Sequence, residues 1–210
     1  MENFRFKQSM PSFELTADNY LRCYNLYNNL YLPITEFCDL DDVRSIAESF
    51  KLTNGKFFPL PLLLHATSEQ AAELKDCSKC ILLYRGEEVG NLEIKNISEF
   101  NIDNFSHQIF GVNTDDHPGI KYIKSSGSHI IAGKVYIHKT PVWLKEDPHH
   151  FTPEELVEKI QNKTFETVAG FQTRNVPHRA HEYLQRLALE YTDGLLIQPL
   201  VGWKKPGDFS

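Results

Sequence analysis

The stretch that decides the fold runs from residue 167 to residue 201 and reads TVAGFQTRNVPHRAHEYLQRLALEYTDGLLIQPLV. Thr167 to Phe171 has the composition of a strand. Apolar residues at helical spacing then predict a helix from about His178 to Tyr191, which ends at Asp193-Gly194. Leu195 to Val201 is the next expected strand. A strand, a helix and a strand within about 35 residues form a βαβ unit, the seed of a parallel sheet.

One βαβ unit does not complete a doubly wound sheet. A parallel strand needs cover on both faces, and a single helix covers only one. The sequence ends at Ser210, soon after the second strand. We therefore expect the chain to be a fragment of a longer protein, or to be completed by a partner chain.

The residues before this unit mark a domain boundary. Glu146 to His150 is a polar stretch with a proline and is typical of a linker. Thr152-Pro-Glu-Glu155 follows as a capping box with proline at the first helical position, which predicts a helix from Pro153 to about Gln161. We expect an N-terminal β domain over 1–148 and the start of an α/β domain over 149–210.

The N-terminal part has mainly β patterning with short helices. Helices are expected at Asp39 to Phe50 and, capped by Thr67 or Ser68, through Leu74. The run from Phe57 to Leu64 contains two prolines, which indicates an edge or bulged strand.

Two hairpins are expected further along. One pairs Ile81 to Tyr84 with Val89 to Ile94, and the other pairs Ile130-Ile131 with Val135 to Ile137 around a turn at 132–134. Short strands at this spacing favour a small barrel or sandwich.

Composition excludes several classes of protein. The 210 residues are 41% hydrophobic and carry a net charge of −6, which argues against dedicated nucleic-acid binding. No apolar run approaches the ~18 residues of a membrane helix, and the polar first ten residues do not resemble a signal peptide. We expect a cytoplasmic protein with neither nucleic-acid nor membrane partners.

The four cysteines favour a reducing compartment rather than a disulfide scaffold. Cys77 and Cys80 form a C-x-x-C pair without a second ligand pair, and it follows a helix pattern and leads into a strand. We expect both cysteines to be structural and predict no metal site.

The densest group of chemically active side chains lies between the strand and the helix of the βαβ unit. Ligands of open α/β sheets bind at the carboxyl ends of strands, where helix N-termini offer N–H groups to anions. His178 and His181 share a face of the first helical turn, Arg174 adds positive charge, and Asn175 is the expected N-cap. The group predicts a polyanion site, with nucleotide phosphates as the expected ligand. The alternatives are an ordinary surface pair or zinc ligands, although zinc commonly uses i, i+4 spacing.

A second group, Gly202 to Asp208, follows the second strand, so Lys204 and Lys205 are expected near the first group. Its alternative is a solvated turn, since Pro-Gly-Asp is favourable turn chemistry. The sequence has no P-loop and no dinucleotide-binding G-x-G-x-x-G.

Together these motifs resemble those of the sulfate adenylyltransferase (ATP sulfurylase) family. The matching stretches are Gln172 to Asn175, His178 to Glu182, Gly194 to Ile197, Pro199 to Gly202 and Lys205 to Asp208. Weaker similarity reaches Leu32 to Phe37, Lys51 to Gly55, Phe58 to Leu62 and Asp116 to Gly119. The resemblance spans nearly the whole chain but only the first half or so of a typical family member.

The resemblance implies a fold and a reaction. The fold is an α+β, PUA-like β-barrel followed by the beginning of a Rossmann-like α/β nucleotidyltransferase domain of the H-x-x-H type. The reaction joins ATP and sulfate to give adenylyl sulfate (APS) and pyrophosphate, the first step of sulfate activation, with Mg²⁺ accompanying ATP. A homo-oligomer and an APS kinase, fused or separate, are further expectations.

The resemblance also assigns roles. Sulfate is already deprotonated at neutral pH, so catalysis comes from positioning and charge neutralisation. Gln172 and Arg174 are implied to hold sulfate, Thr173 to Asn175 to line the reaction centre, and His178 and His181 to donate to phosphate oxygens. Lys205 is implied, with Gln172, Arg174 and Asn175, in binding sulfate or ATP.

The sequence departs from the family pattern in places. Val176-Pro177 reverses the usual order, Gln198 replaces a frequent histidine, and Glu36 replaces a common glycine. The family's later Gly-Arg-Asp-His-type motif lies beyond this chain. Two alternatives are a non-catalytic PUA-like binding module or subunit, and another H-x-x-H nucleotidyltransferase. Gln172 to Asn175 favours the sulfate enzyme over the latter.

Overall fold

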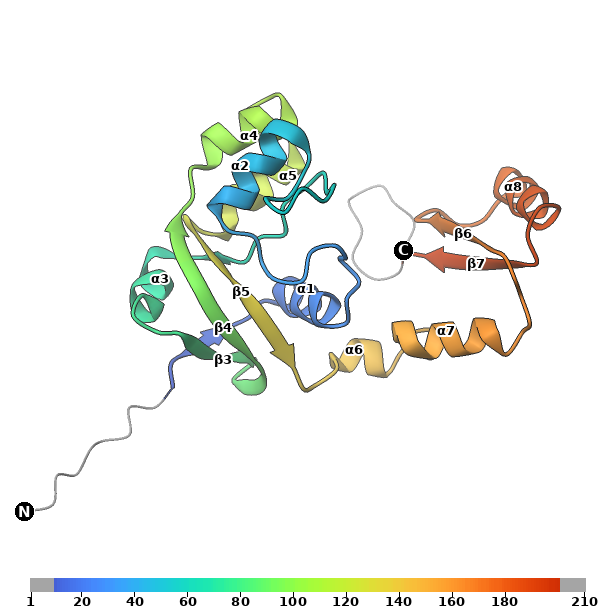
Figure 1. Ribbon diagram of the computed structural model, residues 1–210, viewed down its shortest axis with the longest axis horizontal. Helices are drawn as coiled ribbons and strands as arrows, with labels where there is room; N and C mark the ends of the chain where they lie inside the picture. The colour runs from blue at the N-terminus through green and yellow to red at the C-terminus, as the bar shows by residue number, and fades with distance from the viewer. Residues whose placement is uncertain (1–9, 201–210) are drawn as a thin grey trace, which may run out of the picture. The chain divides into compact units, whose positions relative to one another are not determined.

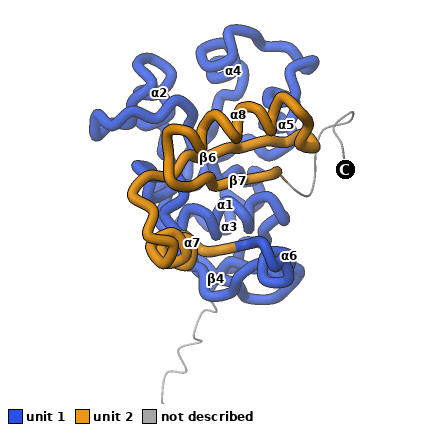
Figure 2. The backbone as a smooth tube through the Cα atoms, turned by 90° about the vertical axis from the view of Figure 1, so that its right-hand side faces the viewer, with its two compact units in different colours: residues 1–150 blue, residues 151–210 orange. Residues whose placement is uncertain are grey.

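The computed structural model describes residues 10–200, which divide into two compact units. Unit 1 extends to His150 and unit 2 begins at Phe151, so the division falls at the end of the polar 146–150 stretch (Figure 2). Among the described residues, no helix has the length and apolar character needed to cross a membrane.

Unit 1 is built on a five-stranded mixed sheet in the order β1-β3-β4-β5-β2 (Figure 1). The strands are β1 (Ser12–Glu14), β2 (His65–Ala66), β3 (Lys79–Tyr84), β4 (Glu87–Glu99) and β5 (His129–Ile137). β1 runs parallel to β3 and the other neighbours are antiparallel. The β3–β4 hairpin confirms the first expected hairpin. The sheet has edges at β1 and β2, so the described residues form an open mixed sheet, half of a barrel.

The second expected hairpin is wrong. Residues 129–137 form one uninterrupted strand, and Gly133 lies within it rather than in a turn. A Cβ at Gly133 would lie 2.1 Å from the backbone oxygen of Glu93 on β4. It lies at a register shift in β4 between Ile94 and Asn96. Glycine here permits close approach of a neighbouring strand.

The strand expected from Phe57 to Leu64 is also wrong. Only an isolated bridge between Phe57 and Lys51 forms there, and β2 does not begin until His65. Pro59 and Pro61 supply no N–H donors, so the segment cannot make a regular ladder. It still contacts its neighbours through single bonds, such as Cys38 N–H to the Leu62 oxygen at 3.0 Å.

Helices contribute more to unit 1 than the sequence patterning indicated. They are α1 (Ala17–Tyr27), α2 (Leu40–Ser49), α3 (Ser68–Leu74), α4 (Ile102–Phe110), α5 (Pro118–Ser126) and α6 (Val142–Lys145). The capping box at Thr67 confirms the expected start of α3. The core includes the fully buried Ile46, Leu64 and Leu92. Burial raises the pKa of the Cys23 and Cys80 thiols to about 12, which keeps both protonated.

Unit 2 contains the expected βαβ unit. α7 (Pro153–Gln161) is followed by β6 (Val168–Thr173), α8 (Arg179–Leu189) and β7 (Gly194–Pro199), and β6 pairs parallel to β7. The α7 capping box is confirmed: Thr152 Oγ1 accepts from Glu155 N–H at 3.3 Å, and the Glu155 carboxylate accepts from Thr152 N–H at 2.8 Å.

The described part of unit 2 has almost no core of its own. Thr173 is the one side chain of residues 151–200 that is buried. α8 instead exposes large apolar side chains, including Tyr183 at 67% and Leu184 at 51%. The strand and helix pattern therefore forms, but much of the apolar surface is uncovered.

Candidate functional site

The predicted site residues gather where β6 leads into α8. Gln172 and Thr173 are the last residues of β6, and Arg174 and Asn175 follow in the loop. His178 is the N-cap of α8, and His181 lies in its first turn. Lys205 lies outside the described residues. The carboxyl ends of two neighbouring parallel strands meet at this junction, because Thr173 is paired with Pro199 of β7.

Thr173 shapes the loop. Its hydroxyl accepts from the Asn175 N–H at 3.1 Å and lies 3.2 Å from the Asn175 carbonyl oxygen, to which it donates. Its own carbonyl accepts from Leu200 N–H at 2.7 Å. The side chain is 5% exposed. Thr173 therefore fixes the turn that carries Arg174 and ties it to the end of β7.

The two histidines cap the helix together. Ala180 N–H donates to His178 Nδ1, and His178 N–H donates to His181 Nδ1, both at 3.3 Å. Their ring centroids are 4.0 Å apart. The expectation of Asn175 as N-cap is wrong: an imidazole takes that role, and the Asn175 N–H is used in the Thr173 turn.

This cap determines where the histidine protons lie. Each Nδ1 accepts a hydrogen bond from the backbone, so a neutral ring carries its proton on Nε2. Nε2–H is a donor, and it belongs to a ring held at a helix N-terminus, where the helix dipole favours anions. The pair therefore offers two neutral N–H donors without requiring protonation.

Two contacts were missed by the sequence reasoning, one at the junction and one at the opposite end of β6. The Phe171 ring meets the His181 ring edge to face, with centroids 5.7 Å apart. The Asp193 carboxylate accepts from the N–H groups of Glu166 and Thr167, at 3.0 and 2.8 Å, and from the Thr167 hydroxyl at 2.9 Å. These bonds hold the pKa of Asp193 below its usual value. The sequence signalled Asp193 only as a helix stop.

The chemistry of the junction is that of an anion site. It combines two imidazole donors, a guanidinium, an amide and the N-terminal end of a helix. The nearby carboxylate of Glu182 is bound to Arg186 at 2.8 Å. Among the described residues, no three histidine, cysteine or acidic side chains are grouped as metal ligands.

The C-x-x-C pair is split between two environments. Cys80 is buried in β3, whereas Cys77 is half-buried and its thiol lies 3.8 Å from the Glu73 carbonyl oxygen. All four cysteines are free.

Fold and junction together define a PUA-like domain joined to an α/β unit with a candidate site at its strand-to-helix junction. Residues 2–140 match the PUA-like domain family, to which the chain belongs, and residues 147–210 match the ATP-sulfurylase family. Residues 147–210 are thus similar to ATP sulfurylases.

The curated relatives are sulfate adenylyltransferases from distant organisms. That of Deinococcus radiodurans is 36% identical over 94% of this chain and 50% of its own length. Those of Carboxydothermus hydrogenoformans and Hyperthermus butylicus are 35% and 30% identical, over 96% of this chain and 53% and 52% of theirs. The chain thus spans about half the length of the curated relatives it matches.

A solved structure shares the fold. A hexameric APS kinase from Thiobacillus denitrificans matches with a TM-score of 0.69 and 19% identity, over 95% of this chain and 36% of that chain.

Proposed function

We propose that this chain supplies the PUA-like domain and the opening part of the catalytic domain of a sulfate adenylyltransferase. The observation that carries the proposal is the β6–α8 junction, where the reciprocal cap holds His178 and His181 with Nε2 as the donor nitrogen. The family match over residues 147–210 supports it.

The reaction converts ATP and sulfate into adenylyl sulfate and pyrophosphate. A sulfate oxygen forms a bond to the α-phosphorus, and the bond from that phosphorus to the bridging oxygen breaks. Pyrophosphate leaves with the electron pair of that bond. No proton has to be removed from sulfate, so the site needs donors and positive charge rather than a base.

The roles follow from position. Gln172 and Arg174 bind sulfate at the end of β6. Thr173 and Asn175 shape the loop, which also brings the Asn175 side chain to the reaction centre. His178 and His181 donate from Nε2 to the phosphate oxygens as charge develops. Lys205 is proposed to contact ATP or sulfate.

Mg²⁺ enters this proposal as part of the substrate. The described donors at the junction are imidazole, guanidinium and amide groups, which suit phosphate oxygens. Mg²⁺ prefers oxygen ligands and is often bound through the substrate's phosphates. When bound to ATP, it neutralises phosphate charge, and the protein donors engage the remaining oxygens.

Further parts of the proposal concern the complete protein. β6 and β7 are proposed as neighbouring strands of a larger, Rossmann-like sheet. ATP and free thiols suit the cytoplasm. A homo-oligomer and an APS kinase, fused or separate, fit the same function.

A chimaera tests the function. This chain replaces the matched half of the Deinococcus radiodurans relative, and pyrophosphate release is measured with ATP, Mg²⁺ and sulfate. We expect sulfate-dependent release.

Arg174→Ala should abolish APS synthesis more completely than it weakens ATP binding, because sulfate depends on few charge-assisted contacts. His181→Ala should lower turnover by about 10²–10³ with a small effect on ATP binding.

Arg186→Gln is the matched control, because Arg186 lies on α8 and pairs with Glu182. It should retain near wild-type turnover. A folded chimaera that binds ATP but releases no pyrophosphate would contradict the proposal, as would full activity of the Arg174→Ala chimaera.

A further inference from the structure

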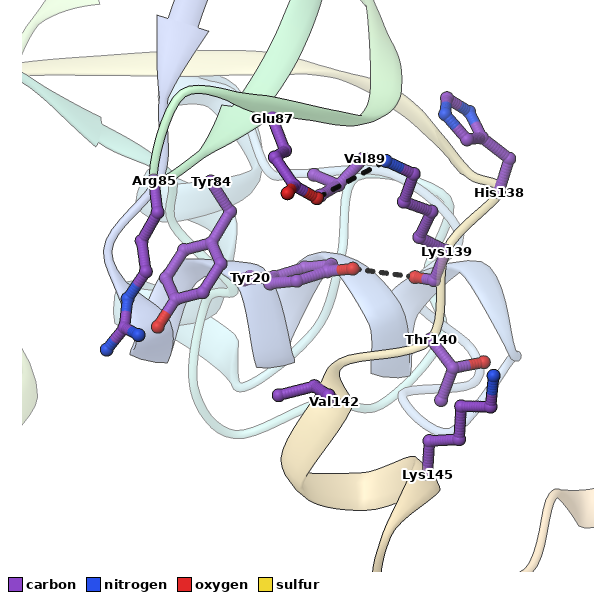
Figure 3. A pocket seen from close by; sticks show the side chains of 10 residues that line it. All are labelled: Tyr20, Tyr84, Arg85, Glu87, Val89, His138, Lys139, Thr140, Val142 and Lys145. Carbon is purple, nitrogen blue, oxygen red and sulfur yellow. Dashed lines mark hydrogen bonds and ion pairs between the residues drawn. The ribbon is translucent and has the colours of Figure 1, made fainter.

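A pocket lies entirely within unit 1, at the end of the sheet where the β3–β4 hairpin, the end of β5 and α6 meet (Figure 3). Its volume is about 710 Å³. Cavities that bind small organic ligands have volumes of roughly 300–1,000 Å³. The proposed sulfate chemistry uses none of its residues.

The floor of this pocket is aromatic. Tyr20 and Tyr84 line it, with ring centroids 5.2 Å apart. The Trp143 ring meets both edge to face, at 5.7 Å from Tyr20 and 5.5 Å from Tyr84. Val89 and Val142 add aliphatic surface. Tyr20 is only 3% exposed, so a flat, apolar ring would find its contact surface mainly on the half-buried Tyr84 and the exposed Val142.

The Tyr20 hydroxyl is already committed. It donates to the Lys139 carbonyl oxygen at 2.8 Å, as Figure 3 shows. Burial, with the nearby Glu87 carboxylate, raises the pKa of Tyr20 to about 12, so the phenol stays neutral. The floor therefore contributes no negative charge.

The rim is positive although the chain as a whole carries a net charge of −6. Arg85, Lys139 and Lys145 line the pocket against a single carboxylate, that of Glu87. Glu87 lies 3.5 Å from the Lys139 ammonium. Within residues 10–200, Arg85 and Lys145 have no carboxylate partner, so local positive charge remains for an anion.

The outer edge carries one further pair. His138 Nε2 lies 4.0 Å from the Glu88 carboxylate, and both side chains are about half exposed. Glu88 does not line the pocket.

The two ends of the pocket differ. Arg85 lies over the Tyr84 ring, 5.3 Å from its centroid, at the end nearest the hairpin. At the opposite end, the Lys145 side chain runs back toward the Thr140 hydroxyl (Figure 3). The pocket thus has a ring-binding end at Tyr84 and an end rich in cation and hydroxyl donors at Thr140 and Lys145.

The geometry points to a binding site in unit 1 for a small aromatic anion, a flat ring joined to a phosphate, sulfate or carboxylate group, of about the size of a nucleoside monophosphate. The ring packs on Tyr84 and Val142 above the buried Tyr20, and the anionic group binds Lys145 and Thr140. This site shares no residue with the β6–α8 junction and does not depend on the proposed function.

The fluorescence of Trp143 reports on binding at this pocket. The chain has two tryptophans, so Trp203→Phe leaves Trp143, which contacts both floor rings, as the reporter. In the full 210-residue chain with this substitution, AMP and phenyl phosphate are titrated against Trp143 fluorescence. Adenosine supplies a ring without the charge, and inorganic phosphate supplies the charge without a ring.

We expect AMP and phenyl phosphate to change the Trp143 emission with saturation below about 1 mM, a typical affinity for a weak small-molecule site. Adenosine and phosphate should each bind at least about tenfold more weakly, since each lacks one half of the contacts. Failure of AMP and phenyl phosphate to saturate, or equal binding of adenosine and AMP, would overturn the proposal.

Variants separate this pocket from the other anion site. Arg85 has φ +52°, a conformation that asparagine tolerates, so Arg85→Asn combined with Lys145→Gln removes both charges without backbone strain. It should weaken AMP binding by at least about tenfold, as expected for losing charge-assisted contacts. Arg174→Ala, at the β6–α8 junction, and Lys56→Gln, an exposed lysine elsewhere, should leave the Trp143 titration unchanged. A titration abolished by Arg174→Ala, or unaffected by the double variant, would refute the assignment.

Discussion

At the scale of single residues, His65 is a buried imidazole whose protonation bears on stability. Its side chain is 5% exposed, its ring packs against Phe100 with centroids 5.6 Å apart, and its Nδ1 has no hydrogen-bond partner within the described structure. Burial first, and then the positive charge of Arg22, lower the pKa of His65 to about 4. The folded protein therefore holds this imidazole neutral.

This burial predicts acid sensitivity. An unfolded histidine titrates near pH 6.5, so between about pH 6.5 and 4 the unfolded state binds the extra proton and the folded state is penalised. The contribution of His65 to the free energy of unfolding is fully present above pH 6.5. It should fall by roughly 2 kcal/mol when the pH is lowered from 7 to 4.5. Urea unfolding at both pH values, for wild type and for His65→Leu, measures it. An identical pH dependence in the two proteins would show that His65 is not responsible.

Gly133 gives a second prediction at this scale. A methyl group there would meet the Glu93 backbone oxygen at 2.1 Å, and backbone cannot move aside as a side-chain tip can. Gly133→Ala should destabilise unit 1 by about 3 kcal/mol, in the range of strongly overpacked substitutions. Gly55→Ala is the control, because Gly55 has a positive φ but open space around it, and should cost about 1 kcal/mol. Thermal unfolding measures the stability of both variants. Equal losses of stability in Gly133→Ala and Gly55→Ala would contradict the steric argument.

At the scale of elements, α7 depends on its N-terminal cap. Thr152→Ala removes the hydroxyl that accepts from Glu155 N–H and should cost about 1 kcal/mol. Amide hydrogen exchange in α7 should then be about fivefold faster, if it proceeds by local opening. Thr152→Ser keeps the hydroxyl and should exchange at the wild-type rate. Unchanged exchange in Thr152→Ala would mean that tertiary contacts, rather than the cap, hold the helix.

The comparison of α7 with β5 explains what the sequence could predict. The bounds of α7 follow from a proline and a capping box, which are signals within a few residues. The role of Gly133 in β5 depends on Glu93, 40 positions earlier, so local turn chemistry misled the interpretation. The apolar run from Phe57 to Leu64 has strand composition, but its prolines leave no ladder to form.

The candidate site shows the same division. The order of strand, polar loop and helix was sufficient to bring Gln172 to His181 together, because it follows from the βαβ pattern. The cap was misassigned since asparagine is the commoner capping residue, and an imidazole that caps a helix looks no different in sequence from a surface histidine. The contact of Phe171 with His181 joins a strand to a helix and has no local signal.

At the scale of the whole molecule, the two units differ in self-sufficiency. Unit 1 buries a continuous apolar core, whereas residues 151–200 leave Tyr183, Leu184 and Tyr191 between 51% and 79% exposed. A chain of residues 1–150 should therefore fold alone and give the dispersed amide NMR spectrum of a packed domain. A chain of residues 151–210 should lack dispersion, because its described part, residues 151–200, has two strands and two helices with almost no buried side chains. A disordered 1–150 chain, or a well-dispersed 151–210 spectrum, would contradict this division.

The parallel pairing of β1 with β3 has a consequence for synthesis on the ribosome. Ser12 pairs with Ile81, so the first strand made waits for its neighbour while residues up to about Tyr84 are added. The remaining strands are complete at Ile137, before any residue of β6 has been translated. Since domains generally fold as units during translation, the nascent chain should acquire its first protease-resistant state when unit 1 has emerged, ahead of the segment that carries the candidate site.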